Sequence, residues 1–203
     1  MGSSAASVWN GRRWNRLGRR GRSRRKDAPS LFSDLRRVTL LVVSLLLLTF
    51  VLLNYVGQRV AVDGSSMVPA LEDGDQLLVD KLSYQISDPE RFDIVIFALK
   101  DDPDRYYIKR VIGLPGETVQ ITEGVIYIDG EALEEDYGLA VIADAKRAEE
   151  PITLGDDEYF VLGDNRNNSK DSRSDDVGNV SRSQIMGKAV FRIWPFSSFG
   201  SLS

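Results

Sequence analysis

Two residues of this chain, Ser66 and Lys109, have the chemistry of a hydrolytic pair. The 203 residues contain no His and no Cys, which excludes a Ser-His-Asp triad, a Cys-His pair and any metal site built on His or Cys. A serine nucleophile would therefore need another base. Lysine is the remaining side chain that acts as a neutral base, provided that apolar surroundings lower its pKa. We expect Ser66 to be the nucleophile and Lys109 to be its base.

The sequence around Ser66 predicts a sharp turn, because Gly64 and Pro69 bracket it. Such a turn would expose the hydroxyl and the backbone N–H of Ser66. Gly64 has no side chain, so a substrate carbonyl could come close to the backbone there. This stretch alone does not distinguish a nucleophile from an ordinary surface serine.

Lys109 lies in a strand-like run, residues 105–112, whose apolar members favour burial. A buried lysine without a carboxylate partner is costly, and a depressed pKa is the usual resolution. Because side chains alternate along a strand, Arg110 should point to the opposite face from Lys109. Only one of these two cations can face the site.

A polar loop, residues 163–173 with the sequence GDNRNNSKDSR, follows the apolar run 159–162. It could bring hydroxyls and paired charges to a neighbouring lysine. Its oxygen atoms also invite comparison with a calcium-binding loop, but the EF-hand pattern of Asp, Asn, Gly and a final Glu is absent. We expect neither a metal nor an organic cofactor.

The elements that must position these residues begin after an uncharged apolar run, residues 38–56. As a helix these 19 residues would span about 28 Å, close to the hydrocarbon thickness of a bilayer. Residues 1–37 carry 11 Lys/Arg against 2 Asp/Glu, a net charge of +9, whereas residues 38–203 carry −13. The positive-inside rule then predicts a single-pass protein of the plasma membrane with a cytoplasmic N-terminus and an extracytoplasmic domain, residues 57–203.

Other interpretations of the N-terminal region fit less well. A cleavable signal peptide has a shorter apolar core and ends in a small-residue cleavage pattern that is absent here. A buried core helix would be shorter or amphipathic. The basic segment 1–37 could bind nucleic acid, but a disordered tail that contacts anionic lipid explains it better, and we expect no nucleic-acid partner.

Past residue 56 the sequence has short β segments separated by turn residues. The expected strands are residues 76–81, 92–98, 105–112, 118–122, 125–128, 159–162 and 188–194. A turn at residues 123–124 makes 118–128 a predicted hairpin. Residues 131–151 are acidic without strand periodicity, so we expect a loop or small insertion there. The domain is predicted to be mostly β.

Four stretches together resemble the diagnostic boxes of bacterial type I signal peptidases. They are residues 64–69 (GSSMVP), 91–97 (RFDIVIF), 107–116 (YIKRVIGLPG) and 163–173. The resemblance runs in order from the apolar run to Phe196. It implies one transmembrane helix followed by an antiparallel β domain that acts as a Ser-Lys endopeptidase. Its substrates would be secretory preproteins with small residues at positions −1 and −3, held as an extended strand.

The resemblance also assigns roles to individual residues. Ser66 matches the nucleophile, Lys109 the general base, and Ser169 the hydroxyl that orients the lysine. The residues matching those that support the oxyanion and the dyad are Gly64, Asp164, Asp171 and Arg173. The residues expected to contact substrate are Val62, Met67, Tyr107 and Ile108.

Four positions depart from the family's frequent pattern. Gly64 replaces a serine of many Gram-negative members, so we expect backbone donors to stabilise the oxyanion. Ala70 replaces a threonine, Phe92 a glycine and Asn167 an aspartate. Two other functions remain open: a self-cleaving repressor-type Ser-Lys peptidase, which the apolar run argues against, and a non-catalytic membrane-anchored protein that binds exported chains.

Overall fold

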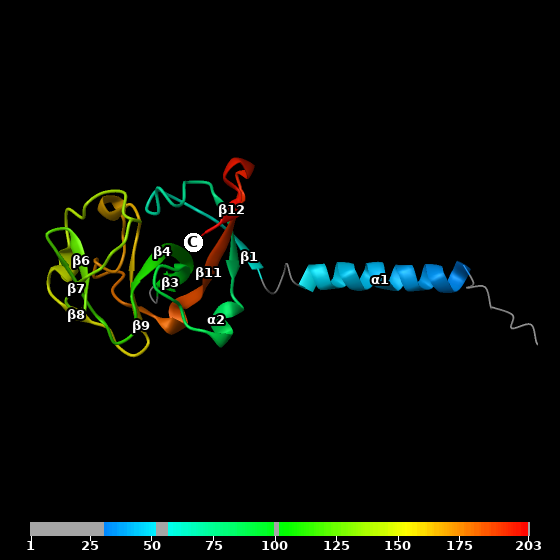
Figure 1. The fold of residues 1–203 in the computed structure, drawn as a ribbon, viewed down its shortest axis with the longest axis horizontal. Helices are drawn as coiled ribbons and strands as arrows, with labels where there is room; N and C mark the ends of the chain where they lie inside the picture. The colour runs from blue at the N-terminus through cyan, green and yellow to red at the C-terminus, as the bar shows by residue number, and fades with distance from the viewer. Residues whose placement is uncertain (1–30, 52–56, 100–101, 203) are drawn as a thin grey trace, which may run out of the picture. The chain divides into compact units, whose positions relative to one another are not determined.

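The computed structural model describes residues 31–51, 57–99 and 102–202 (Figure 1). Helix α1 (Leu31–Val51) has exposed apolar side chains from Leu35 to Phe50. No helix within these described ranges is both long enough and apolar enough to cross a membrane. Of the predicted transmembrane segment 38–56, residues 52–56 lie outside the described residues, as does most of the basic segment 1–37.

The β domain is built on a larger antiparallel sheet in the order β1-β2-β11-β3-β4-β9-β10, with β12 paired to β11. Its strands are β1 (Gly57–Ala61), β2 (Gln76–Asp80), β3 (Ile94–Leu99), β4 (Asp102–Gly113), β9 (Glu158–Leu162), β10 (Val180–Ser181), β11 (Ile185–Trp194) and β12 (Gly200–Ser201). Every pairing is antiparallel. The prediction of an antiparallel, mostly β domain is confirmed.

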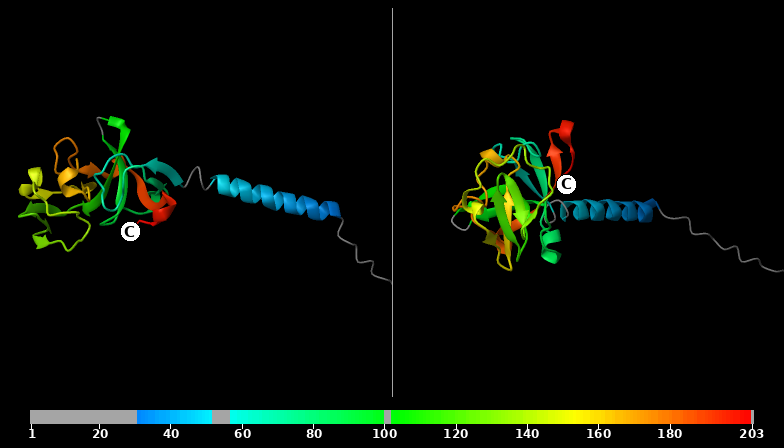
Figure 2. Two further views of the ribbon diagram at one scale, coloured as in Figure 1. Left: turned by 90° about the horizontal axis from the view of Figure 1, so that it is seen from above. Right: turned by 60° about the vertical axis from the view of Figure 1, so that its left-hand side comes forward.

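A smaller antiparallel sheet has the order β7-β6-β5-β8. Its strands are β5 (Thr118–Thr122), β6 (Val125–Ile128), β7 (Glu131–Ala132) and β8 (Ile152–Thr153). The β5–β6 turn places Glu123 and Gly124 at φ 52° and 78°, the left-handed geometry that suits two-residue hairpins. The predicted hairpin is therefore confirmed. In Figure 1 and Figure 2 this sheet and β1 lie at opposite ends of the β domain.

Short helical turns connect the strands. They are α2 (Ser83–Ile86), η2 (Lys146–Glu149), η3 (Arg166–Asn168), η4 (Arg182–Gln184) and η5 (Phe196–Ser198). The expected loop or insertion, residues 131–151, begins with the two-residue strand β7, and the rest of it, residues 133–151, contains η2 and no strand.

The central strands are buried on both faces, which explains their continuous apolar runs. In β3, Ile94 and Ile96 pack into a core cluster with Val62 and Met67, whereas Val95 and Phe97 pack into a second cluster on the other face. A third cluster fills the space at the smaller sheet. This packing fixes β3 and its neighbour β4, the strand that carries Lys109.

Candidate active site

Ser66 lies in the connection between β1 and β2, which apolar side chains hold in place. Met67 and Leu71 are buried in the first core cluster, and the Leu71 N–H donates to the Met67 carbonyl oxygen at 2.9 Å. Gly64 has φ +92°, a conformation that favours glycine, and a Cβ there would contact nothing within 4 Å. The chain therefore turns before Ser66 and leaves the space beside Gly64 open.

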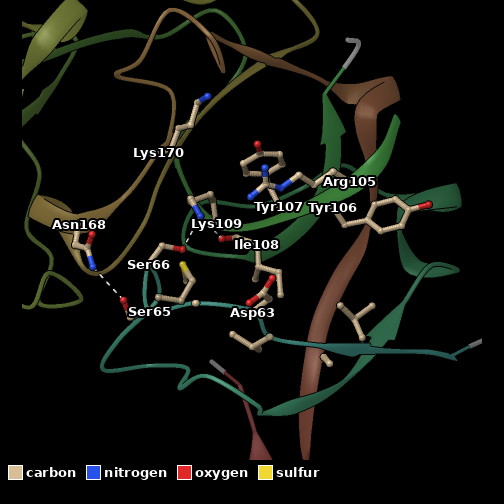
Figure 3. Close-up of a pocket in the computed structure, with 15 residues that line it drawn as sticks. Asp63, Ser65, Ser66, Arg105, Tyr106, Tyr107, Ile108, Lys109, Asn168 and Lys170 are labelled. Atoms are coloured by element: carbon tan, nitrogen blue, oxygen red, sulfur yellow. Dashed lines mark hydrogen bonds between the residues drawn. The ribbon is translucent and has the colours of Figure 1, made fainter. Parts of the chain in front are cut away.

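Lys109 lies in β4, opposite Val95 of β3. Its Nζ atom donates to Ser66 Oγ at 2.7 Å and to the Ile108 carbonyl oxygen at 2.8 Å (Figure 3). The side chain is buried. Burial lowers the pKa of Lys109 from 10.5 to about 8, although the negative charges of Asp171 and Asp164 oppose the shift.

Arg110 points away from Lys109, as strand alternation predicts, and forms a buried pair with Asp164. The Arg110 Nε and Nη2 atoms donate to the two Asp164 carboxylate oxygens at 2.9 and 2.8 Å. Both side chains are almost fully buried. A pair of this kind is costly to break, because the partner left behind is an uncompensated buried charge.

Asp171 and Arg173 form a second buried pair in the 163–173 loop. The Arg173 Nε and Nη2 atoms donate to Asp171 at 2.9 Å each. Asp171 also accepts the Gly163 N–H at 3.2 Å. The two carboxylates that act on Lys109 are thus each neutralised by an arginine.

Ser169 lies near the site, and no hydrogen bond joins it to Lys109 among the described residues. Its Oγ atom is buried and has no hydrogen-bond partner among the described residues. A Cβ on Gly163 would lie 2.2 Å from that oxygen and 2.5 Å from the Ser66 carbonyl oxygen, so these three residues are packed together. The structure brings Ser169 beside the Ser66 backbone, and its role toward Lys109 stays a prediction.

Two asparagines that the sequence analysis did not single out hold the nucleophile segment to the polar loop. The Asn165 N–H donates to the Ser66 carbonyl oxygen at 3.0 Å, and its Nδ2 donates to the Ser65 carbonyl oxygen at 3.1 Å. The Asn168 Nδ2 donates to Ser65 Oγ at 3.0 Å. The several asparagines of this loop were the available signal, but the sequence could not indicate which groups of Ser65 and Ser66 they bind.

A cavity of about 510 Å³ opens at Ser66 and Lys109. One wall is residues 60–67, the other is residues 105–109, and Asn168 and Lys170 complete the lining (Figure 3). The predicted substrate contacts Val62, Met67, Tyr107 and Ile108 all line this cavity. Three of them, Val62, Met67 and Ile108, are buried in the first core cluster.

Two strand edges border the cavity. Strand β1 pairs only with β2, and β4 pairs with β9 only from Arg110 onward. Within the described residues, no strand pairs with the outer edge of β1, nor with residues 105–109 on the side away from β3. An extended peptide could lie between these edges and complete the sheet.

In the described parts of the chain, no group of three or more Asp or Glu side chains is arranged to hold a metal ion. The two carboxylates whose charges act on Lys109, Asp164 and Asp171, are already paired with arginines.

Comparisons with known proteins agree with one another. A family model described as "Signal peptidase, peptidase S26" matches residues 35–194. The chain is similar to a probable signal peptidase I-2 of Synechocystis sp., with 36% identity over 188 residues, 89% of this chain and 83% of that protein. It is 40% identical to a signal peptidase I of Leptolyngbya laminosa over 183 residues, 87% of this chain and 85% of that protein. A crystal structure of a signal peptidase I from Enterococcus faecalis V583 matches with 34% identity and a TM-score of 0.42, covering 51% of this chain and 97% of that one.

Proposed function

The chain belongs to the signal peptidase family, peptidase S26, and from this premise we propose that it removes signal peptides from exported preproteins by means of a Ser66–Lys109 dyad. The observation that carries the proposal is the 2.7 Å contact between Lys109 Nζ and Ser66 Oγ at the cavity. A nucleophile within hydrogen-bond reach of a buried base is the arrangement that covalent catalysis requires.

Acylation begins when neutral Lys109 accepts the hydroxyl proton of Ser66 while Oγ attacks the scissile carbonyl carbon. The oxyanion that forms accepts a hydrogen bond from the Ser66 backbone N–H, and the open space beside Gly64 admits the carbonyl. The protonated lysine then gives its proton to the leaving amine of the mature protein. The product is an ester between Ser66 and the end of the signal peptide.

Deacylation uses the same two residues. A water molecule loses a proton to Lys109 and attacks the ester carbonyl, after which Ser66 Oγ takes the proton back as it leaves. The signal peptide departs with a free carboxylate. Lys109 is neutral again, so one base serves both steps.

Specificity for small residues at −1 and −3 is supported by the lining of the cavity. Val62, Met67 and Ile108 are held in the core, so they cannot move away from the cavity without overlapping their packed neighbours. A peptide bound as a strand between β1 and residues 105–109 would point alternate side chains at these walls. Small side chains would fit there, and large ones would clash.

Membrane anchoring is the remaining part of the proposal. Its support is the uncharged run 38–56, the basic segment before it, and the exposed apolar side chains of α1. In this topology the N-terminus is cytoplasmic and the catalytic domain meets preproteins on the outer face of the plasma membrane.

The experiment is cleavage of a preprotein whose signal ends in Ala-x-Ala by the detergent-solubilised full chain, with the cut located by mass spectrometry. We expect one cut after the second alanine and none when that alanine is replaced by leucine. Ser183→Ala, at an exposed serine, serves as the control variant and should cut like wild type. Binding of the preprotein without any cut would instead support a non-catalytic binding protein.

A further inference from the structure

Residues 135–139, which we call the strap, contact two buried arginines, Arg166 and Arg110. Glu135 accepts from Arg166 Nη1 and Nη2 at 2.7 and 2.8 Å. Burial alone would raise the pKa of Glu135, but the hydrogen bonds and charge of Arg166, together with the backbone N–H groups of Tyr137 and Gly138, outweigh burial and lower the pKa. At the other end, the Leu139 N–H donates to the Asp164 carbonyl oxygen at 2.9 Å. The strap is therefore tied to the same loop that carries Asp164.

Tyr137, in the middle of the strap, covers the guanidinium of Arg110. The Arg110 Cζ atom lies 3.8 Å from the centroid of the Tyr137 ring, a close cation–π contact. The ring of Phe92 lies 5.0 Å from the Tyr137 ring. Arg110 Nη1 donates to the Phe92 carbonyl oxygen at 2.9 Å. Arg110 is thus enclosed by Asp164, Tyr137 and the Phe92 backbone.

The strained backbone of Phe92 supports a functional role for the enclosure of Arg110. Phe92 has φ +74°, a left-handed conformation that costs a non-glycine residue about 1–2 kcal/mol. A glycine would adopt it freely but would have no ring to place against Tyr137. Strain of this kind persists where the surroundings hold it and often lies near functional sites.

The enclosed pair influences the proposed base through its electric field. Asp164 is one of the two carboxylates whose charge raises the pKa of Lys109, and Arg110 neutralises it. The other is Asp171, which Arg173 neutralises. Among the described residues, the other charged or titratable side chains near Lys109 include Tyr107, whose ring centroid lies 6.0 Å away, and, in the cavity lining, Asp63, Arg105, Tyr106 and Lys170.

We propose that Tyr137 is a positioning residue of the Ser66–Lys109 dyad, because its ring holds the Arg110 guanidinium on Asp164. The inference rests on the proposed function. Without the ring, Arg110 gains freedom and Asp164 is less completely neutralised. The carboxylate then favours the charged form of Lys109, which cannot accept the Ser66 proton.

The test is the pH dependence of kcat, from pH 6 to 9.5, for preprotein cleavage by the full chain in detergent. Tyr137→Leu removes the aromatic face, whereas Tyr137→Phe keeps it. We expect Tyr137→Leu to shift the acid limb of the kcat–pH profile to higher pH by about one unit, which lowers kcat at pH 7 about tenfold. Tyr137→Phe should have the same profile as wild type. Tyr127→Leu, in β6 of the smaller sheet, is the matched control and should leave the limb in place.

A merely structural role would lower the melting temperature of Tyr137→Leu without moving its acid limb, and that result would overturn the inference. An equal shift in Tyr137→Phe would overturn it as well, because the ring would then not be the cause. Tyr137→Met replaces the leucine variant if that protein does not fold. A wild-type chain that cuts no preprotein would refute the proposed function itself, whereas an active wild type with an unmoved limb in the variant refutes only this inference.

Discussion

The Nζ atom of Lys109 lies 2.7 Å from the Oγ atom of Ser66, although 43 positions separate the two residues in the chain. Strand β4 supplies the lysine and the β1–β2 connection supplies the serine. Both are anchored by core side chains, Ile108 beside the lysine and Met67 beside the serine. The packing of the core therefore holds the two backbone segments that bring Ser66 and Lys109 together.

Cleavage should accelerate as the pH rises through about 8. Burial lowers the pKa of Lys109 to about 8, and only the neutral amine accepts the Ser66 proton. Below that pKa the neutral fraction falls about tenfold per pH unit. Measurement of kcat at saturating preprotein between pH 6 and 9 tests this, and a flat profile over that range would contradict it.

Lys109→Met should increase stability while it removes activity. Below pH 8 Lys109 is charged in both states, but its charge is buried in the folded chain and hydrated in the unfolded chain. The unfolded state therefore binds the proton more tightly, which lowers the free energy of unfolding. This loss of folding stability is greatest below the folded pKa of about 8 and disappears as the pH rises toward 10.5. Its size is about 1–3 kcal/mol after allowance for lost hydrogen bonds. Urea unfolding at pH 7 and pH 10 should show a gain for the variant that narrows at the higher pH; equal stabilities at pH 7 would refute the account of burial.

Ser169→Ala should leave stability unchanged or slightly higher, because the Ser169 hydroxyl is buried and has no hydrogen-bond partner in the part of the chain that the structure describes. If that hydroxyl orients Lys109 during the reaction, kcat falls nevertheless. Ser172→Ala is the matched comparison: its Oγ accepts the Val161 N–H at 2.9 Å, so its loss should cost about 1–3 kcal/mol. Melting temperatures and kcat of both variants separate the two roles, and a Ser169→Ala variant with full activity would remove Ser169 from the site.

Gly163→Ala should inactivate the enzyme by displacing the nucleophile. A Cβ at this position would lie 2.5 Å from the Ser66 carbonyl oxygen, a backbone atom that cannot rotate away. We expect at least a tenfold loss of kcat, since misplacement by about 1 Å can cost about 100-fold. Gly200→Ala, where a Cβ meets nothing within 4 Å, should be neutral. Wild-type kcat in Gly163→Ala would show that the Ser66 segment can move without consequence.

Much of the fold could be predicted from local patterns. The apolar runs 92–98 and 105–112 correspond to β3 and β4, and the predicted hairpin is β5–β6. The opposite orientations of Lys109 and Arg110 follow from strand alternation and are confirmed by their different partners. These features are local, so the sequence carries them directly.

Strand β1 could not be predicted, because it is short and only partly buried and so lacks a strong apolar pattern.

The contacts that the sequence could not predict are long-range and polar. The strap appeared in the sequence only as part of an acidic stretch, yet Glu135 pairs with Arg166 and Tyr137 covers Arg110. Charge and hydroxyl content suggest that such side chains need partners, but only the folded chain shows which ones they meet.

The most direct measurement of the central claim is cleavage of one Ala-x-Ala preprotein by wild type, Ser66→Ala and Lys109→Met in parallel, with folding of each protein verified by its melting transition. The account predicts that wild type cuts after the second alanine and that both variants are folded and silent, because the nucleophile is absent in one and its base in the other. If either folded variant cuts at a rate near that of wild type, Ser66 and Lys109 are not the dyad.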